Sequence, residues 1–184
     1  MPTLISDHVP PDRDVMFQSE NGVLGIGPAP PPGAEQPWLI NAGKQHVTLR
    51  DGGSYFHHAD SFAMIRGGHL DLCVLGALEV AENGDLANWA TSATDAAPAV
   101  GGAMDLAVGA KRVWVVMEHC ARDGSSKLVR RCQYPLTAAT SVSRIYTNLA
   151  VLDIGPRGFV LVELAPDISF ESLEARTEAP VYKN

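Results

Sequence analysis

An acidic residue stands where a short apolar segment meets a glycine-rich break. The segment Asp14–Gln18 is predicted to be a buried strand, and Ser19-Glu20-Asn21-Gly22 interrupts it abruptly. Ligands of α/β proteins bind at strand ends, and a carboxylate that loses part of its hydration there becomes a stronger nucleophile. Carboxylates form covalent intermediates in several enzymes. Glu20 is therefore a candidate nucleophile, and the alternative is that it only caps the following turn.

Glycines surround this position and recur later in the chain. Gly22, Gly25 and Gly27 tolerate positive φ and let the backbone approach a ligand closely. They do not form the G-x-G-x-x-G fingerprint of dinucleotide sites. Gly101-Gly102 precedes a predicted helix, where exposed N–H groups can hold an anion or a developing oxyanion. The alternative for this pair is a tight turn that needs two glycines.

Other polar residues carry weaker signals. No metal is expected, because the histidines and nearby aspartates lack metal-ligand spacing: His57, His58, His69, Asp60 and Asp71. Lys44 and Arg66, at the ends of predicted elements, either meet a carboxylate or phosphate or are simply solvated. The cysteines are odd in number and are expected to be small apolar fillers in a reducing cytoplasm: Cys73, Cys120 and Cys132.

Composition limits the class of protein. The 184 residues are enough for one domain, expected to span residues 1–184. A net charge of −7 argues against nucleic acid as the main partner. No segment approaches the ~20 apolar residues of a membrane span, and the first residues have neither the basic nor the apolar region of a secretory signal. A cytoplasmic location is therefore expected.

The elements that position these residues follow from periodicity and turn signals. The residues after Gly22, as far as Pro37, are rich in Gly and Pro and are predicted to form a loop. Strands are predicted at Gln45–Leu49, Leu70–Val80, Val113–Met117, Ala150–Ile154 and Phe159–Leu164. Helices are predicted at Asp60–Ile65 with Asp60 as N-cap, within Pro98–Ala110, and at Ser169–Glu178 with Ser169 as N-cap. Short apolar strands that alternate with helices predict an α/β domain with a largely parallel sheet.

Several sequence blocks together resemble a known family. Residues 19–28, S-E-N-G-V-L-G-I-G-P, look like the S-E-N-G-x-x-G-x-G-P signature in the B half of family I coenzyme A transferases. Five further blocks are similar to that family and come in its order: residues 41–44, 61–69, 84–89, 101–106 and 117–119. Residues 54–60 and 98–102 are closer to the branch acting on 3-oxoadipate than to the acetoacetate branch, although both branches share the other blocks.

The resemblance implies a fold, a reaction and a set of roles. The fold would be a three-layer α/β/α domain with a mostly parallel central sheet. Glu20 would carry CoA as a glutamyl-CoA thioester between succinyl-CoA and a 3-oxoacid, with no cofactor beyond the CoA substrate. The Gly102 N–H would help to hold the oxyanion, and the partner would be an A subunit. CoA or substrate binding would involve Asn21, Gly22, Gly25, Gly27, Lys44 and Gly101.

The chain departs from the family pattern at two places. It begins Met1-Pro2-Thr3, which matches the inside of a family loop G-I-G-x-P-T, so the preceding helix and strand of the family are expected to be missing and a sheet edge unpaired. Glu79 stands where the family often has glutamine. Two alternatives stay open at this point: a non-catalytic module that binds CoA or its partner, and a sugar-phosphate isomerase, which shares the fold.

Overall fold

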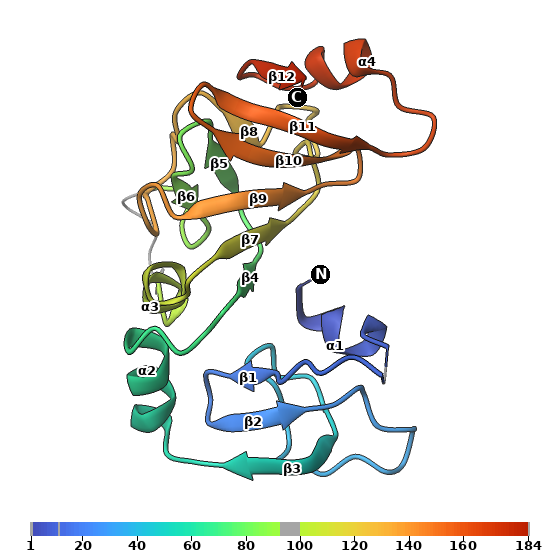
Figure 1. The fold of residues 1–184 in the computed structure, drawn as a ribbon, viewed down its shortest axis with the longest axis vertical. Helices are drawn as coiled ribbons and strands as arrows, with labels where there is room; N and C mark the ends of the chain where they lie inside the picture. Colours follow the sequence, from blue (N-terminus) through green and yellow to red (C-terminus); the bar gives the residue numbers. More distant parts are fainter. Residues whose placement is uncertain (1, 11, 93–99, 184) are drawn as a thin grey trace. The chain divides into compact units, whose positions relative to one another are not determined.

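The computed structural model describes residues 2–10, 12–92 and 100–183. The chain divides into two compact units, Met1–Gly67 (unit 1) and Gly68–Asn184 (unit 2). Each unit has its own hydrogen-bonded sheet and its own cluster of buried apolar side chains (Figure 1). The single domain over residues 1–184 depends on how the two units are placed, and it stays a prediction.

Unit 1 is built on a small antiparallel sheet. Its strands lie in the order β1-β2-β3, and its elements are η1 (Pro2–Leu4), α1 (Ile5–His8), β1 (Gln18–Ser19), β2 (Val23–Ile26), β3 (Leu49–Tyr55) and α2 (His58–Arg66). Four buried side chains form its core, with Phe17 and Leu49 packed against them: Val23, Ile26, Leu39 and Val47. Since this core is small, backbone hydrogen bonds and tight turns carry much of the local order.

Two strand predictions and one loop prediction for unit 1 are wrong or displaced. Residues 14–16 are exposed, and only Gln18–Ser19 of the predicted first strand region pairs in the sheet. Val23–Ile26 is strand β2 and not loop, because a bulge between Leu24 and Ile26 accommodates its glycine. The strand predicted at Gln45–Leu49 begins only at Leu49. Helix α2 is confirmed, but His57 caps it: the His57 Nδ1 accepts the Ala59 N–H at 3.1 Å.

Unit 2 contains a mixed six-stranded sheet and a second, three-stranded sheet. The large sheet has the order β12-β11-β10-β9-β7-β4, with parallel pairs β12/β11, β9/β7 and β7/β4 and antiparallel pairs β11/β10 and β10/β9. Its strands are β4 (Cys73–Leu75), β7 (Val113–Val116), β9 (Val142–Tyr146), β10 (Ala150–Gly155), β11 (Gly158–Leu164) and β12 (Val181–Lys183). The small sheet joins β6 (Leu86–Ala87), β5 (Glu79–Ala81) and β8 (Leu128–Val129), and the helices are α3 (Ala103–Gly109) and α4 (Phe170–Glu174).

Sequence patterns predict unit 2 more accurately than unit 1. Strand β7, the β10/β11 hairpin and both helices are confirmed, and the Ser169 Oγ accepts the Ser172 N–H at 3.1 Å as the N-cap of α4. The predicted strand Leu70–Val80 is wrong as a single element, because it divides into β4 and β5, which belong to different sheets. Pro98 and Ala99, at the start of the predicted α3 region, lie outside the described residues.

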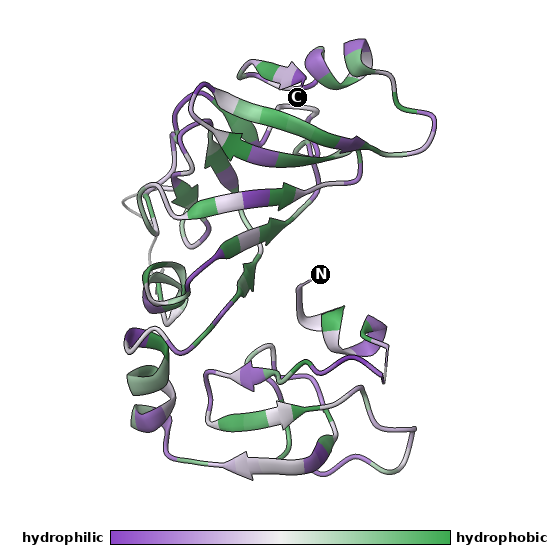
Figure 2. Cartoon of the chain, in the orientation of Figure 1, coloured by the Kyte–Doolittle hydropathy of each residue, from purple (hydrophilic) through white to green (hydrophobic). Residues whose placement is uncertain are grey.

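The core of unit 2 lies between these sheets and the helices. Hydrophobic residues, green in Figure 2, concentrate on strands such as β4, β7, β10 and β11. Val115, Ile145, Leu152 and Phe159 are fully buried there, together with Leu128 of the small sheet.

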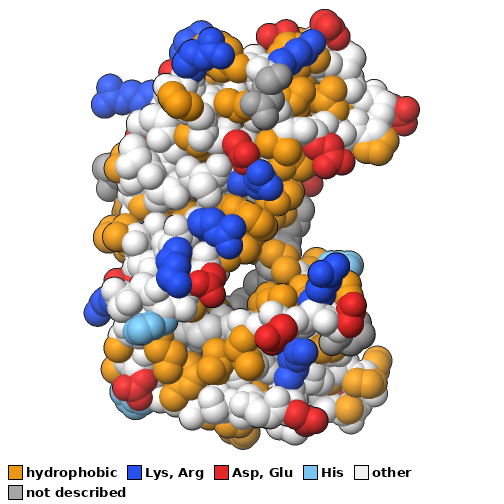
Figure 3. Space-filling view, in the orientation of Figure 1, with side chains coloured by type: hydrophobic (Ala, Val, Ile, Leu, Met, Phe, Trp, Pro, Cys, Tyr) orange, Lys and Arg blue, Asp and Glu red, His pale blue; other side chains and the backbone are white. Residues whose placement is uncertain are grey.

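On the face drawn in Figure 3, basic and acidic side chains are interspersed over each unit. The described helices are all too short to cross a membrane.

A buried histidine joins three segments of unit 2. His119 has no exposed surface, and its ring nitrogens Nδ1 and Nε2 each lie 3.0 Å from a hydroxyl oxygen, of Thr147 and Thr177 respectively. The Thr177 hydroxyl donates to the Leu173 carbonyl at 2.7 Å, so we infer that Nε2–H donates to Thr177 and Nδ1 accepts from Thr147. Burial, with a smaller effect of the charge on Arg176, lowers the pKa of His119 to about 4.

This pKa predicts acid-sensitive folding. Between pH 6.5 and about 4 the unfolded chain takes up a proton at His119 that the folded chain does not, so the stabilisation present above pH 6.5 is lost as the pH falls. We expect His119 to account for a loss of about 2 kcal/mol of unfolding free energy between pH 7 and pH 5. Urea titrations at both pH values measure it. The His119→Gln variant should not show this loss of unfolding free energy between pH 7 and pH 5. A variant at the exposed His69 should still show it. An equal loss in the wild type and both variants would contradict the role of His119.

Candidate active site

Glu20 lies at the tip of a tight β-hairpin in unit 1. Strands β1 and β2 pair antiparallel with Ser19 opposite Val23, so Glu20, Asn21 and Gly22 form the whole turn. The Gly22 N–H donates to the Ser19 carbonyl at 3.0 Å, and the Glu20 side chain is half-buried. Glu20 therefore directly follows a strand, as expected, but this strand is only Gln18–Ser19 and pairs in an antiparallel hairpin.

Gly22 holds this turn against the chain that precedes α2. Its φ of +105° is one that residues with a side chain rarely adopt, and a Cβ at this position would overlap the Phe56 carbonyl oxygen. In return the Gly22 carbonyl accepts the Phe56 N–H at 3.0 Å. Three-residue hairpin turns commonly end in a left-handed glycine. The glycine is thus required by the turn itself.

A buried serine anchors the base of the hairpin from two sides. The Ser19 Oγ accepts the Ala42 N–H at 3.0 Å, and the Ser19 carbonyl accepts the Ser61 hydroxyl of α2 at 3.4 Å. Ser61 is fully buried and also accepts the Gln18 side-chain amide at 2.5 Å. Sequence reasoning missed these anchors. The S-E-N-G block marks Ser19, but no sequence signal connects it with Ser61 forty-two residues away.

The predicted Lys44 belongs to a second turn that is tied to the same hairpin. The Asn21 side-chain amide donates to the Ile40 carbonyl at 2.8 Å, and the Lys44 N–H donates to the Asn41 carbonyl at 2.9 Å. Lys44 has a positive φ of +61° and an exposed side chain. The structure thus brings the turn of Lys44 against the turn of Glu20 and Asn21, through bonds of Asn21 and Ser19 with residues 40 and 42.

Local packing explains why glycine occupies positions 25 and 27. Gly25 has a φ of +83°, and an added Cβ would come within 2.8 Å of the Gly53 Cα on the neighbouring strand. At Gly27 a Cβ would overlap the Thr48 hydroxyl, and the Gly27 N–H donates to the Thr48 carbonyl at 2.8 Å. Gly25 therefore lets β2 approach β3 closely, and Gly27, just after β2, lets the chain approach Thr48. Their approach to a ligand stays a prediction.

Gly101 and Gly102 belong to unit 2, whereas Glu20 belongs to unit 1. Gly102 is the N-cap residue of α3, with no side-chain cap, and Gly101 before it has a φ of +55°. A Cβ at Gly101 would meet no atom within 4 Å, so packing does not require a glycine here. The positive φ is what favours glycine at this position. The predicted loop-to-helix junction is confirmed, and its oxyanion role stays a prediction.

The remaining candidates divide into buried and exposed residues. Cys73 is buried, Cys120 and Cys132 are half-buried, and all three are free thiols. Burial, followed by the charges on Glu79 and Asp85, raises the pKa of the Cys132 thiol to about 12. In the described ranges, no three His, Cys, Asp or Glu side chains are grouped so that they could hold a metal ion.

Comparison with known proteins matches most of the chain to one family. The sequence pattern of the coenzyme A transferase family covers residues 1–174, and the chain belongs to that family. The B subunit of 3-oxoadipate CoA-transferase from Pseudomonas putida is 57% identical over 182 residues, which are 99% of this chain and 85% of that protein. The corresponding protein of the same name from Acinetobacter baylyi is 54% identical, over 97% of this chain and 82% of that one.

Other relatives are somewhat more distant. The B subunit of a probable succinyl-CoA:3-ketoacid coenzyme A transferase of Bacillus subtilis is 50% identical, over 97% of this chain and 82% of that protein. Among solved structures, an acyl-CoA transferase apoenzyme from Escherichia coli O157:H7 matches with a TM-score of 0.70 at 18% identity, over 93% of this chain and 34% of that one. The decarboxylase AibA/AibB matches with a TM-score of 0.64 at 22% identity, over 93% and 68%. These structures establish the CoA-transferase-like α/β fold, here with mixed sheets.

Proposed function

We propose that the chain is the B subunit of a 3-oxoacid CoA-transferase that moves CoA from succinyl-CoA to 3-oxoadipate. The observation that carries this proposal is the 57% identity, over almost the whole chain, with the B subunit of 3-oxoadipate CoA-transferase. Identity with the succinyl-CoA:3-ketoacid relatives is lower, at 50% and 48%. The alternative acceptor within the same reaction class is acetoacetate.

The proposed reaction is a double exchange on the Glu20 carboxylate. Glu20 attacks the thioester carbonyl of succinyl-CoA, which releases the CoA thiolate and leaves a mixed anhydride. The thiolate attacks the glutamyl carbonyl, releases succinate and forms glutamyl-CoA. The carboxylate of the 3-oxoacid then attacks this thioester, which releases the CoA thiolate and leaves a second mixed anhydride. The thiolate attacks the new acyl carbonyl, and Glu20 leaves as a carboxylate. Anhydride and thioester bonds are both activated, so no ATP is consumed.

The hairpin suits this role because it fixes the backbone that carries the Glu20 carboxylate. Short turns, the Gly22 conformation and the Ser19 anchors leave few backbone conformations to Glu20. Positioning of a nucleophile against its substrate contributes strongly to rate. By resemblance to the family, the Gly102 N–H would hold the tetrahedral oxyanion, Lys44 would lie near CoA, and Asn21, Gly22, Gly25, Gly27 and Gly101 would line the path of the CoA arm.

The partner, the overall layering and the location belong to the same proposal. The relatives are called B or beta subunits, which implies a second kind of subunit, and we propose an A subunit that completes the acyl site. In the assembled protein the three-layer α/β/α arrangement with a mostly parallel central sheet would be complete, and residues 1–184 would act as one domain. Free thiols at all three cysteines favour the cytoplasm.

Steady-state kinetics with the assembled A and B subunits test this function. With succinyl-CoA as donor, we expect kcat/KM for 3-oxoadipate to exceed that for acetoacetate by about tenfold or more, because one matched polar contact is typically worth about 1.4 kcal/mol or more. Equal or better use of acetoacetate would favour the alternative acceptor. Absence of turnover with both acids, while CoA still binds, would favour the non-catalytic module.

A further inference from the structure

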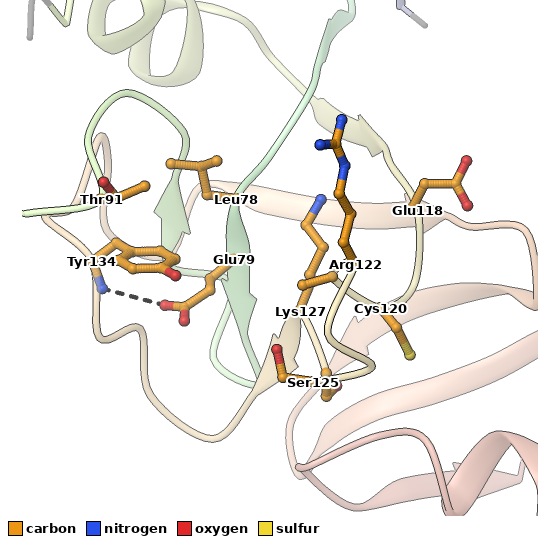
Figure 4. Close-up of a pocket in the computed structure, with 11 residues that line it drawn as sticks. Leu78, Glu79, Thr91, Glu118, Cys120, Arg122, Ser125, Lys127 and Tyr134 are labelled. Atoms are coloured by element: carbon orange, nitrogen blue, oxygen red, sulfur yellow. Dashed lines mark hydrogen bonds between the residues drawn. The ribbon is translucent and has the colours of Figure 1, made fainter.

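Unit 2 contains a pocket of about 380 Å³ that is lined by none of the candidate catalytic or CoA-binding residues named above (Figure 4). Part of its lining follows the parallel strands β4 and β7: Leu78 and Glu79 come after β4, and Glu118 and Cys120 come after β7. Because the two strands are parallel, their following segments leave the same edge of the sheet. This edge, beyond the carboxyl ends of parallel strands, is where α/β proteins bind ligands.

Two cationic side chains enter the pocket from one short hairpin. Cys120 pairs antiparallel with Ser126, and the Ala121 N–H donates to the Ser125 carbonyl at 2.8 Å, so Arg122 lies at the turn and Lys127 at the base. The backbone of Lys127 is held twice: its N–H donates to the His119 carbonyl at 3.1 Å, and its carbonyl accepts the Val80 N–H at 2.9 Å. The base of the hairpin is therefore a fixed position.

Both cations lack a bonded counter-charge. In the part of the chain that the structure describes, neither the Lys127 ammonium nor the Arg122 guanidinium forms an ion pair or a side-chain hydrogen bond. Lys127 is half-buried, and this burial lowers its pKa, while the charge on Glu118 acts in the opposite direction. A partly desolvated cation without a bonded partner is unfavourable. An anion in the pocket would remove this cost.

The two carboxylates of the pocket do not fill this role. Glu79 is buried, and its Oε2 accepts the N–H groups of Gln133 at 2.7 Å and of Tyr134 at 3.3 Å. Figure 4 shows Glu79 beside Tyr134, whereas the heads of Arg122 and Lys127 extend on another side of the pocket. Glu118 is exposed and, within the described residues, lies beyond ion-pair distance of Lys127. Within the described residues, neither carboxylate therefore forms an ion pair with Lys127 or Arg122.

We propose that this pocket binds an oxyanion group, a carboxylate or a phosphate, between Lys127 and Arg122. A guanidinium and an ammonium are the side chains that recognise such groups, Arg by its fork and Lys as a point charge. The volume lies in the range of small-molecule sites. The source of the anion rests on the proposed function: it is either the second carboxylate of a dicarboxylic acyl group or a phosphate of CoA.

Direct binding of two probes to the full chain tests the site without any turnover. Inorganic phosphate and succinate are titrated by calorimetry into the wild type, Lys127→Met, Arg122→Gln and the control Lys111→Met. Lys111 is an exposed cation paired with Asp71 at 2.7 Å, outside the pocket. We expect at least one probe to bind the wild type and the control alike, and to bind each pocket variant about tenfold to a hundredfold more weakly.

The probe that binds identifies the source, and kinetics of the A–B enzyme check it. If the group is the acyl carboxylate, Lys127→Met raises KM for 3-oxoadipate and leaves KM for acetoacetate unchanged. If it is a CoA phosphate, the variant raises KM for acetoacetyl-CoA in the reverse reaction, because acetoacetyl-CoA has the CoA phosphates but no second carboxylate. Arg122→Gln, at an exposed turn, keeps the test valid should Lys127→Met fold poorly. Absence of saturable binding to the wild type, or unchanged binding by both variants, overturns the site, whatever the result at Glu20.

Discussion

Replacement of Glu20 by alanine is expected to lower kcat of the A–B complex by at least about 10⁴-fold, because the covalent route then has no nucleophile. The side chain stands on a hairpin whose backbone is held by Ser19 and Gly22, so its removal should leave the fold intact. The loss is measured with succinyl-CoA and 3-oxoadipate at saturating concentrations. Mass spectrometry of the complex incubated with donor alone should find the glutamyl-CoA adduct on Glu20 in the wild type only.

Two variants separate the chemistry of Glu20 from general effects of charge. Glu20→Asp keeps the carboxylate but withdraws it by about one bond, which should cost about 10²-fold in kcat, as misplacements of about 1 Å do. Glu35→Ala removes another carboxylate of unit 1, one whose Oε2 accepts the Gly33 N–H at 2.7 Å, and should keep full activity. Wild-type turnover by Glu20→Ala would show that the hairpin does not carry the nucleophile.

The second large effect is expected at Gly22. An alanine there must adopt a φ of +105° and would overlap the Phe56 carbonyl oxygen, so the turn has to move or the Gly22–Phe56 hydrogen bond has to break. We expect Gly22→Ala to lower the free energy of unfolding by about 3–5 kcal/mol, because backbone strain and a steric clash add. Urea titration of the full chain, followed by circular dichroism, measures this loss.

Gly33 provides the matched control for this prediction. It also belongs to unit 1 and has a positive φ of +86°, but a Cβ there would meet no atom within 4 Å. Gly33→Ala should therefore cost only the backbone strain, about 1–2 kcal/mol, and the difference between the two variants reports the clash at Phe56. Activity should fall with Gly22→Ala, since the turn carries Glu20, and stay with Gly33→Ala. Equal losses of stability would mean that the Phe56 contact does not constrain the turn.

Local sequence patterns predicted β7, β10, β11 and the cap of α4 in unit 2, but they missed β6, β8, β9 and β12. Strand β7 (Val113–Val116) and the strands of the β10/β11 hairpin are apolar segments. They are largely buried, as the strand preference of such segments predicts. The cap at Ser169 needs only the residues of its own first turn. Such features depend on neighbours within about four positions, so periodicity and turn chemistry are enough to find them.

The same patterns failed where the partner of a segment was distant. Leu70–Val80 is almost continuously apolar, but β4 pairs with β7 and β5 pairs with β6 and β8, so one apolar run serves two sheets. Residues 23–26 look like part of a loop because Gly25 lies among them and Gly and Pro follow. They form a strand because a bulge and close approach to β3 make use of Gly25. No local rule carries this information, since strand pairing is decided by contacts far along the chain.

For the candidate site, the glycine-rich break after Glu20 made this residue a candidate, and the resemblance of the S-E-N-G block to the family singled it out. What holds that carboxylate emerged only from packing: the anchors at Ser61 and residue 42, the contact of Gly22 with Phe56, and the turn of Lys44 beside Asn21. These contacts join positions about twenty to forty residues apart. These partners cannot be recognised from composition or local patterns, because they meet only when the folded backbone brings them within hydrogen-bond distance.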